Sequence, residues 1–131
     1  MSAPDSGARA GCARLIAALP GQVADESRVA ARGYRYAAAW GKPAIVLRCG
    51  VGLPSGYTQT SACQTVNGIG WFIPQDQVDD SGSDVVATTL HRIPAVEVRI
   101  PASYRPQGPG SAMVDLAHAL TNATKASGHC A

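Results

Sequence analysis

Hydrophobic residues make up 46% of the 131-residue chain, enough to fill the core of one domain, whereas two domains would each be too small to bury a good core. Charged residues make up 15% and the net charge is +2, which argues against a nucleic-acid-binding protein that neutralises phosphates. No apolar run approaches the roughly 20 residues that span a bilayer, so we expect membrane contact only through an N-terminal anchor missing from the chain.

The N-terminal stretch is polar and rich in small residues, without the apolar segment of a signal peptide. We therefore predict that residues 1–11 form a flexible tail from which a leader or anchor has been removed. Residues 12–131 are predicted to form a single disulfide-stapled domain. The first element of that domain is a helix over residues 12–19, because apolar residues recur at helical spacing from Cys12 onward. Pro20 ends this helix.

The clearest strand covers residues 44–49, the longest run that predicts a buried strand. Its side chains alternate between the two faces, so we expect Arg48 on the face opposite to Leu47. The strongest local signal is Asn67-Gly68 between two β-prone runs, because this pair is typical of a type I′ hairpin turn.

Two further strands are predicted over residues 84–90 and 95–101, and in the second, apolar and charged residues alternate as in a half-exposed antiparallel strand. The last element is a helix from Ser111, its N-cap, to about residue 125. The order of a helix, about five strands and a helix predicts an α+β fold. We expect an antiparallel sheet of about five strands with the N- and C-terminal helices packed on one face.

The four cysteines include no closely spaced pair of the kind that binds zinc, so we predict two disulfides and no metal. Disulfides in a small domain indicate an oxidising compartment, which predicts export, either to the extracellular face of the cell membrane or into the medium. Four cysteines allow three pairings. We predict Cys49–Cys63, which closes a short loop, and Cys12–Cys130, which ties the two ends of the chain together.

Four motifs follow one another along the chain: Cys12-x-x-Leu-x-x-Ala-Leu-Pro20, Trp40-Gly-x-Pro-Ala-Ile-Val-Leu-Arg-Cys-Gly-Val51, Cys63-x-x-Val-Asn-Gly-x-x-Trp71 and Thr88-Thr-x-x-Arg-x-Pro-x-Val-Glu-Val-Arg-x-Pro101. Together they resemble a family of small exported envelope proteins of actinobacteria, known as a domain of unknown function. The resemblance covers nearly the whole chain and implies export, with a signal or membrane anchor before the first cysteine. It implies no activity, so it supplies no catalytic residues.

Four residues are candidates for a ligand-binding site: Arg48, Trp71, His91 and Arg92. Arg48 is a charge within an apolar run, either paired with a carboxylate such as Glu97 or marking the open face of the sheet. Trp71 either fills a core of small aliphatic residues or lines a groove. We hypothesise that the four candidates meet on the open face and bind an anionic envelope component, which requires Arg48 and Trp71 to share a face.

The expected function is that of a non-catalytic cell-envelope protein, secreted or membrane-anchored, which binds an envelope protein or a cell-wall component. No sequence pattern of nucleophilic catalysis or of phosphate binding is present, so we predict no catalytic residues and no cofactor. Among the histidines, only His91 lies in a turn where it could take part in chemistry. The alternative function is therefore that of an envelope-acting hydrolase that uses His91 and nearby carboxylates.

Overall fold

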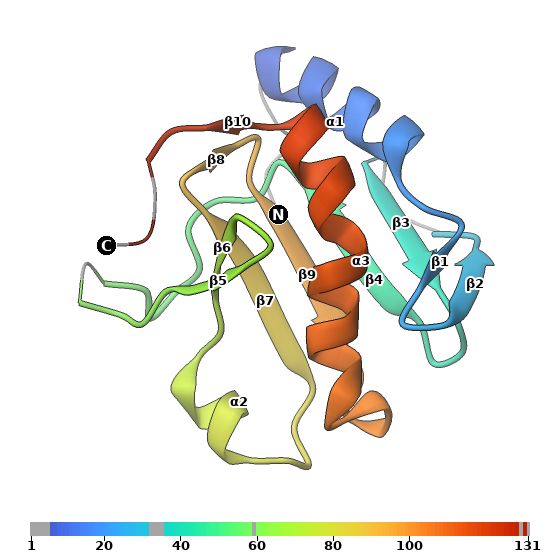
Figure 1. Ribbon diagram of the computed structural model, residues 1–131, viewed down its shortest axis with the longest axis vertical. Helices are drawn as coiled ribbons and strands as arrows, with labels where there is room; N and C mark the ends of the chain where they lie inside the picture. Colours follow the sequence, from blue (N-terminus) through green and yellow to red (C-terminus); the bar gives the residue numbers. More distant parts are fainter. Residues whose placement is uncertain (1–5, 32–35, 59, 129, 131) are drawn as a thin grey trace.

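Fourteen short elements make up the described part of the chain. The computed structural model describes residues 6–31, 36–58, 60–128 and 130 (Figure 1). In chain order the elements are α1 (Ser6–Ala18), β1 (Gln22–Val23), β2 (Glu26–Val29), β3 (Ala37–Trp40), β4 (Ile45–Cys49), β5 (Gln64–Val66), β6 (Ile69–Phe72), α2 (Gln75–Asp79), β7 (Val85–Leu90), β8 (Arg92–Ile93), β9 (Val96–Ile100), the 3₁₀ turn η1 (Ala102–Tyr104), α3 (Gln107–Ala123) and β10 (Lys125–Ala126).

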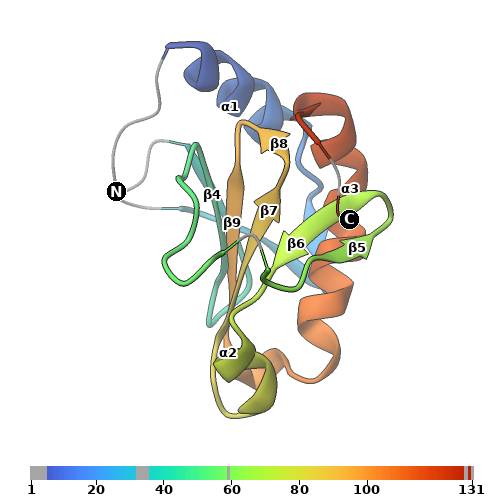
Figure 2. The same ribbon diagram turned by 90° about the vertical axis from the view of Figure 1, so that its left-hand side faces the viewer.

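Eight of the strands form one antiparallel sheet in the order β1-β2-β3-β4-β9-β7-β6-β5, and β8 pairs separately with β10. The helices α1 and α3 lie against each other on one face of the large sheet (Figures 1 and 2). The predicted α+β class with an antiparallel sheet is confirmed, but the sheet has eight strands instead of about five. Strands β1 and β2 were missed because segments of two and four residues are too short to show a hydrophobic period.

The core lies between this sheet and the two helices. Alternate residues of β4 and β9 point into it, as the pattern of the sequence predicts, because successive side chains of a strand face opposite ways. Thr89 of β7 is a buried polar residue of this layer, and its hydroxyl oxygen accepts a hydrogen bond from the backbone N–H of Val96 at 2.9 Å. The polar atom is therefore satisfied inside an apolar core.

Helix α1 begins earlier than its hydrophobic period indicates. It starts at Ser6, so residues 6–11 of the predicted tail are helical, while residues 1–5 lie outside the described part of the chain. Leu15 is fully buried against the core, in agreement with the predicted apolar face. The helix ends at Ala18, two residues before Pro20, as expected because proline cannot continue a helix.

Helix α3 begins at Gln107, and the predicted N-cap at Ser111 is wrong. The residue in the N-cap position is Pro106, and Pro109 follows in the first turn. Proline is tolerated there because the first N–H groups of a helix have no partner within it. Leu116 is fully buried, so the predicted apolar face of this helix does cover the core.

The predicted hairpin turn is confirmed. Asn67 and Gly68 have φ angles of 48° and 86°, and they join β5 to β6. Both values lie in the left-handed region that a type I′ turn requires, and asparagine and glycine adopt this region at low cost.

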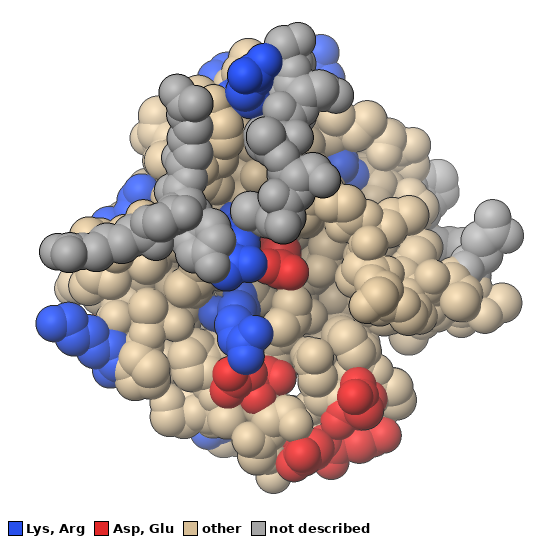
Figure 3. Space-filling model, turned by 180° about the vertical axis from the view of Figure 1, so that it is seen from behind, with Lys and Arg blue, Asp and Glu red and all other residues tan. Residues whose placement is uncertain are grey.

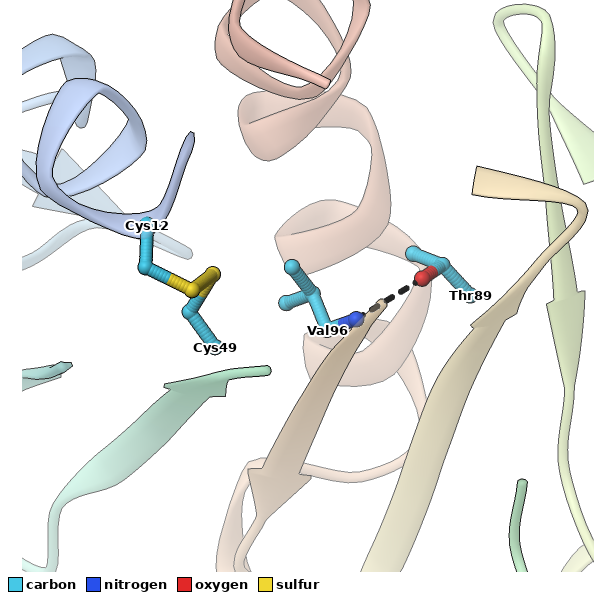
Figure 4. Close-up of a disulfide and its surroundings, with 4 residues drawn as sticks. All are labelled: Cys12, Cys49, Thr89 and Val96. Carbon is cyan, nitrogen blue, oxygen red and sulfur yellow. Dashed lines mark hydrogen bonds between the residues drawn. A yellow bond between two sulfur atoms is a disulfide. The ribbon is translucent and has the colours of Figure 1, made fainter. Parts of the chain in front are cut away.

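The two disulfides are Cys12–Cys49, which joins α1 to β4 inside the core (Figure 4), and Cys63–Cys130, which joins the loop before β5 to the C-terminal segment. Two disulfides are confirmed, but the predicted pairs Cys49–Cys63 and Cys12–Cys130 are wrong. The order of the sheet explains the error, because β9, β7 and β6 lie between β4 and β5. Three intervening strands hold Cys49 and Cys63 too far apart for a bond that needs Cα atoms within about 7 Å.

Candidate functional site

Arg48 lies on the sheet face opposite to α1 and α3. Its partner in the register is Glu97 of β9, and Nη1 of the arginine is 3.8 Å from Oε2 of the glutamate. Further along the same face, Arg99 contacts Asp84 at 3.0 Å. Figure 3 shows basic and acidic side chains next to one another on this side of the molecule. Both alternatives for Arg48 apply in part, because it lies beside Glu97 and also on the face of the sheet that the helices leave open.

Trp71 lies on the helix-covered side of the sheet. Its side chain is 0% exposed and packs in the core, opposite Thr89 in the register of β6 and β7. Leu47 and Cys49 also enter this core, so Arg48, between them on β4, points the other way. The sheet therefore separates Trp71 from Arg48, and the four predicted residues do not meet on one open face.

Arg92 stabilises the C-terminal end of α3. Its Nε donates a hydrogen bond to the hydroxyl of Thr124 at 2.8 Å, and its Nη2 donates to the backbone carbonyls of Leu120 (3.1 Å), Thr121 (3.3 Å) and Thr124 (2.9 Å). The last carbonyls of a helix have no partner within it, and they carry the negative end of the helix dipole. The guanidinium group of Arg92 donates hydrogen bonds to these carbonyls and places a positive charge at the negative end of the helix dipole.

His91 occupies the turn between β7 and β8 with a φ of 59°, in the left-handed region that few residues other than glycine adopt. Its ring packs against Gly128, where a Cβ atom would lie 3.0 Å from Nδ1. Together with Arg92, His91 lines a pocket of about 380 Å³ that also includes Gly70 and Cys130. Of the four predicted residues, the structure thus brings two together, and it does so away from the face that carries Arg48.

A larger cleft, with a volume of about 570 Å³, lies between α2 and the start of α3. Seven of the ten residues that line it are apolar. The lining residues are Gln64, Ile73, Val78, Ser81, Val85, Ala102, Arg105, Pro106, Pro109 and Met113. Val78 of α2, one of the lining residues, is 41% exposed. This volume and this apolar lining are typical of ligand-binding sites.

The cleft is missed in the sequence because its walls come from separate segments. Strands β5 and β7, helices α2 and α3, the turn η1 and their connections all contribute, so no local motif marks the site. The one local signal is Arg105, an arginine between Tyr104 and Pro106 in a segment of prolines and glycines. Because Arg105 lies outside the predicted helices and strands, no hydrophobic periodicity indicates which way its side chain points.

Arg105 holds one wall of the cleft in place. Its Nη1 donates hydrogen bonds to the carbonyls of Gln77 (2.9 Å), Asp80 (2.6 Å) and Ser83 (2.9 Å), and its Nη2 lies 3.4 Å from the carbonyl of Val78. Bonds to a charged donor are stronger than those between neutral groups. Helix α2 has only five residues and buries none of them, so these bonds fix a segment that would otherwise be held weakly.

Carboxylates surround this wall. Asp76 and Asp79 lie in α2 and Asp80 follows directly, and Figure 3 shows acidic side chains gathered at this end of the molecule. The pKa of Asp80 is lowered because its carboxylate accepts hydrogen bonds from the backbone N–H of Gly82 and the hydroxyl of Ser83, with Arg105 as a smaller contribution. Asp80 is therefore ionised at neutral pH. The segment around α2 carries three carboxylates beside the cleft, whereas Arg105 is the one charged residue among the described lining residues.

Chemically, the cleft offers apolar contact, with the carboxylates of the α2 segment nearby. The described lining residues include no histidine, cysteine or carboxylate, the groups that most often act as acids, bases or nucleophiles. In the described ranges, no group of three or more His, Cys, Asp or Glu residues could hold a metal ion. None of the helices seen in these ranges has both the length and the apolar character needed to cross a bilayer.

These features define a disulfide-bonded α+β domain with an apolar cleft at one end of its sheet. Over residues 1–128 the chain matches the model of the family described as "Protein of unknown function (DUF3515)", and it belongs to that family. The resemblance to a domain of unknown function is therefore confirmed. A comparison with curated proteins and a comparison with solved structures each found no match.

Proposed function

We propose that this protein is a non-catalytic binding domain of the actinobacterial cell envelope, secreted or anchored to the extracellular face of the membrane. It would hold an apolar part of a protein or cell-wall ligand in the cleft between α2 and α3. The observation that carries this proposal is the cleft of about 570 Å³, in which seven of ten lining residues are apolar. Burying apolar surface contributes roughly 25 cal/mol per Å², so a ligand that covers Val78 and its neighbours gains affinity from contact alone.

The export part of the proposal rests on the disulfides. Both pairs of cysteines are bonded, and bonds of this kind persist in oxidising compartments outside the cytoplasm. The actinobacterial source and the membrane anchor rest on the sequence motifs that resemble small exported envelope proteins.

The charge around the cleft limits the ligand. Asp76 and Asp79 lie in α2 and Asp80 follows it, so this segment carries three carboxylates against the one guanidinium of Arg105, which donates hydrogen bonds to carbonyls of the same segment. Like charges repel over about 10 Å at 0.1 M ionic strength, so an anionic group at the mouth of the cleft is disfavoured. We therefore expect an apolar ligand whose polar end is uncharged or cationic, in place of the anionic component expected from the sequence.

The hydrolase alternative has less support. It needs a histidine and a carboxylate within hydrogen-bond reach in one pocket. The pocket beside His91 has no aspartate or glutamate among its described lining residues. No observation on this pocket favours hydrolysis over binding.

A calorimetric titration with octyl glucoside below its critical micelle concentration tests the proposal, because this probe joins an eight-carbon chain to an uncharged head. Val78→Arg should weaken its binding about tenfold or more, since the substitution places a solvated charge at the apolar wall. The matched control is Val114→Arg. Val114 is also a surface valine, 48% exposed, and it lies on α3 outside the cleft lining.

Octanoate provides the second arm, because it carries a similar chain on an anionic head. We expect it to bind more weakly than octyl glucoside at low salt, with the difference shrinking as salt is added. Equal loss of affinity in both valine variants, or no saturable binding of octyl glucoside at all, would remove the cleft as the site.

A further inference from the structure

The two disulfides differ in their surroundings. Cys12 and Cys49 are 0% and 2% exposed and are enclosed between α1 and β4. Cys63 and Cys130 are only partly buried, and they join the loop before β5 to the last described residue of the chain. Exchange with an external thiol depends on access to a sulfur atom, so the two bonds should differ in reactivity.

We propose that the Cys63–Cys130 disulfide is a thiol-exchange site, at which a thiol-bearing molecule enters the pocket beside His91 and forms a mixed disulfide with Cys130. The pocket has a volume of about 380 Å³, within the range of small-molecule sites. Cys130 lines it, whereas Cys63 is not among its described lining residues. We therefore expect an incoming molecule to reach the sulfur of Cys130 before that of Cys63.

Two glycines of this pocket lie in close contact with their neighbours. A Cβ atom on Gly70 would lie 2.6 Å from the sulfur of Cys130 and 3.2 Å from that of Cys63, closer than such contacts allow. A Cβ atom on Gly128 would likewise lie 3.0 Å from the ring of His91. Larger residues at either position would collide with the disulfide or with the His91 ring.

The charge of the pocket suits the attacking species. Exchange proceeds through a thiolate anion. The described lining residues include His91 and Arg92 and no carboxylate, so the pocket does not repel an anion. The cleft near α2 differs in that three carboxylates lie in or directly after α2 beside it.

The reaction is a balanced exchange. The thiolate sulfur forms a bond to the Cys130 sulfur while the Cys63–Cys130 bond breaks, and the bonding electron pair leaves with the Cys63 sulfur, which then takes a proton from water. One disulfide replaces another, so the only co-reactant is the thiol itself. A dithiol would complete a second exchange, leaving both cysteines reduced and the dithiol oxidised.

The fold tolerates this change because the bond lies outside the core. The C-terminal segment is otherwise held by the two-residue pairing of β10 with β8 and by the hydrogen bond from the Ser127 N–H to the His91 carbonyl, at 2.8 Å. Opening of the disulfide would release this short segment and leave the Cys12–Cys49 bond in place.

The test treats the oxidised protein with excess 2-mercaptoethanesulfonate at pH 8, alkylates it with iodoacetamide at timed intervals, and maps the peptides by mass spectrometry. We expect the sulfonate adduct on Cys130, alkylation on Cys63, and opening about tenfold or more faster than for Cys12–Cys49. Similar rates for the two disulfides, or an adduct on Cys63 in place of Cys130, would overturn the proposal.

Gly128→Val tests whether the pocket is the route of entry. We expect several-fold slower exchange, because the added side chain narrows the wall next to His91. The control is Gly52→Val, at a loop glycine where a Cβ atom would have no neighbour within 4 Å. Thermal unfolding of each variant checks that it folds, and an unchanged rate in a folded Gly128→Val protein would contradict entry through the pocket.

Discussion

Arginines whose role is ambiguous in the sequence acquire definite partners in the fold. Arg48 lies opposite Glu97, Arg92 donates to the carbonyls at the end of α3, and Arg105 donates to the carbonyls around α2. Two of the three therefore donate to backbone carbonyls at the end of a helix or in a turn. At the scale of residues, guanidinium groups fix the ends of elements in this protein.

The two tryptophans offer a matched comparison. Both are 0% exposed, but the indole N–H of Trp40 donates to the carbonyl of Pro20 at 3.0 Å, whereas that of Trp71 has no partner in the described part of the chain. Trp71→Phe removes an unsatisfied donor, and Trp40→Phe removes a satisfied one. We expect Trp71→Phe to lower the free energy of unfolding by about 1–3 kcal/mol less than Trp40→Phe.

Urea unfolding of the two single variants measures this difference, since both substitutions lose a similar volume from the same core. A larger loss for Trp71→Phe would mean that its N–H does find a partner in solution. The sequence leaves the two tryptophans equivalent, because burial and hydrogen bonding depend on neighbours from other elements.

At the scale of elements, prediction succeeds where one local pattern is sufficient. The strand β4, the strand β9 and the turn at Asn67-Gly68 follow from alternation and from turn chemistry. Prediction fails at the start of α3, where Ser111 is a good capping residue but the helix already begins at Gln107. Packing of the first turn against η1 and the prolines around it decide that boundary.

The segment around α2 depends on one residue. Arg105→Met keeps much of the length of the side chain but removes the bonds to the carbonyls of Gln77, Asp80 and Ser83. We expect the backbone amides of residues 77–84 to exchange hydrogen about 10–100-fold faster, equivalent to about 1.4–2.8 kcal/mol of local stability.

Hydrogen exchange followed by mass spectrometry makes this measurement. Arg99→Met is the control, because Arg99 contacts only the exposed carboxylate of Asp84 in the pairs described, and exposed ion pairs contribute little. If both variants leave the exchange of residues 77–84 unchanged, Arg105 does not hold the wall of the cleft.

At the scale of the whole molecule, the sequence predicts the class of fold but neither the order of the strands in the sheet nor the disulfide pairing. Two disulfides and an α+β class follow from composition and periodicity, whereas the pairing depends on the order of the strands in the sheet. Cys49 and Cys63 are near in sequence, yet three strands lie between β4 and β5 in the sheet. The cleft is hidden for the same reason, because its walls come from segments as distant as Gln64 and Met113.

The small number of methionines in the chain makes binding in the cleft easy to observe by NMR. The chain has two methionines, at positions 1 and 113, and Met113 lines the cleft with 5% of its surface exposed. Labelling the methionine methyl groups with ¹³C therefore gives an NMR signal from the proposed site, that of Met113.

Titration of this labelled protein with octyl glucoside, below its critical micelle concentration, is the most direct test of binding in the cleft. We expect that the Met113 methyl signal shifts and saturates, and that Val78→Arg abolishes the shift while Val114→Arg preserves it. A Met113 signal that stays in place, or that shifts equally in both variants, would contradict binding in the cleft.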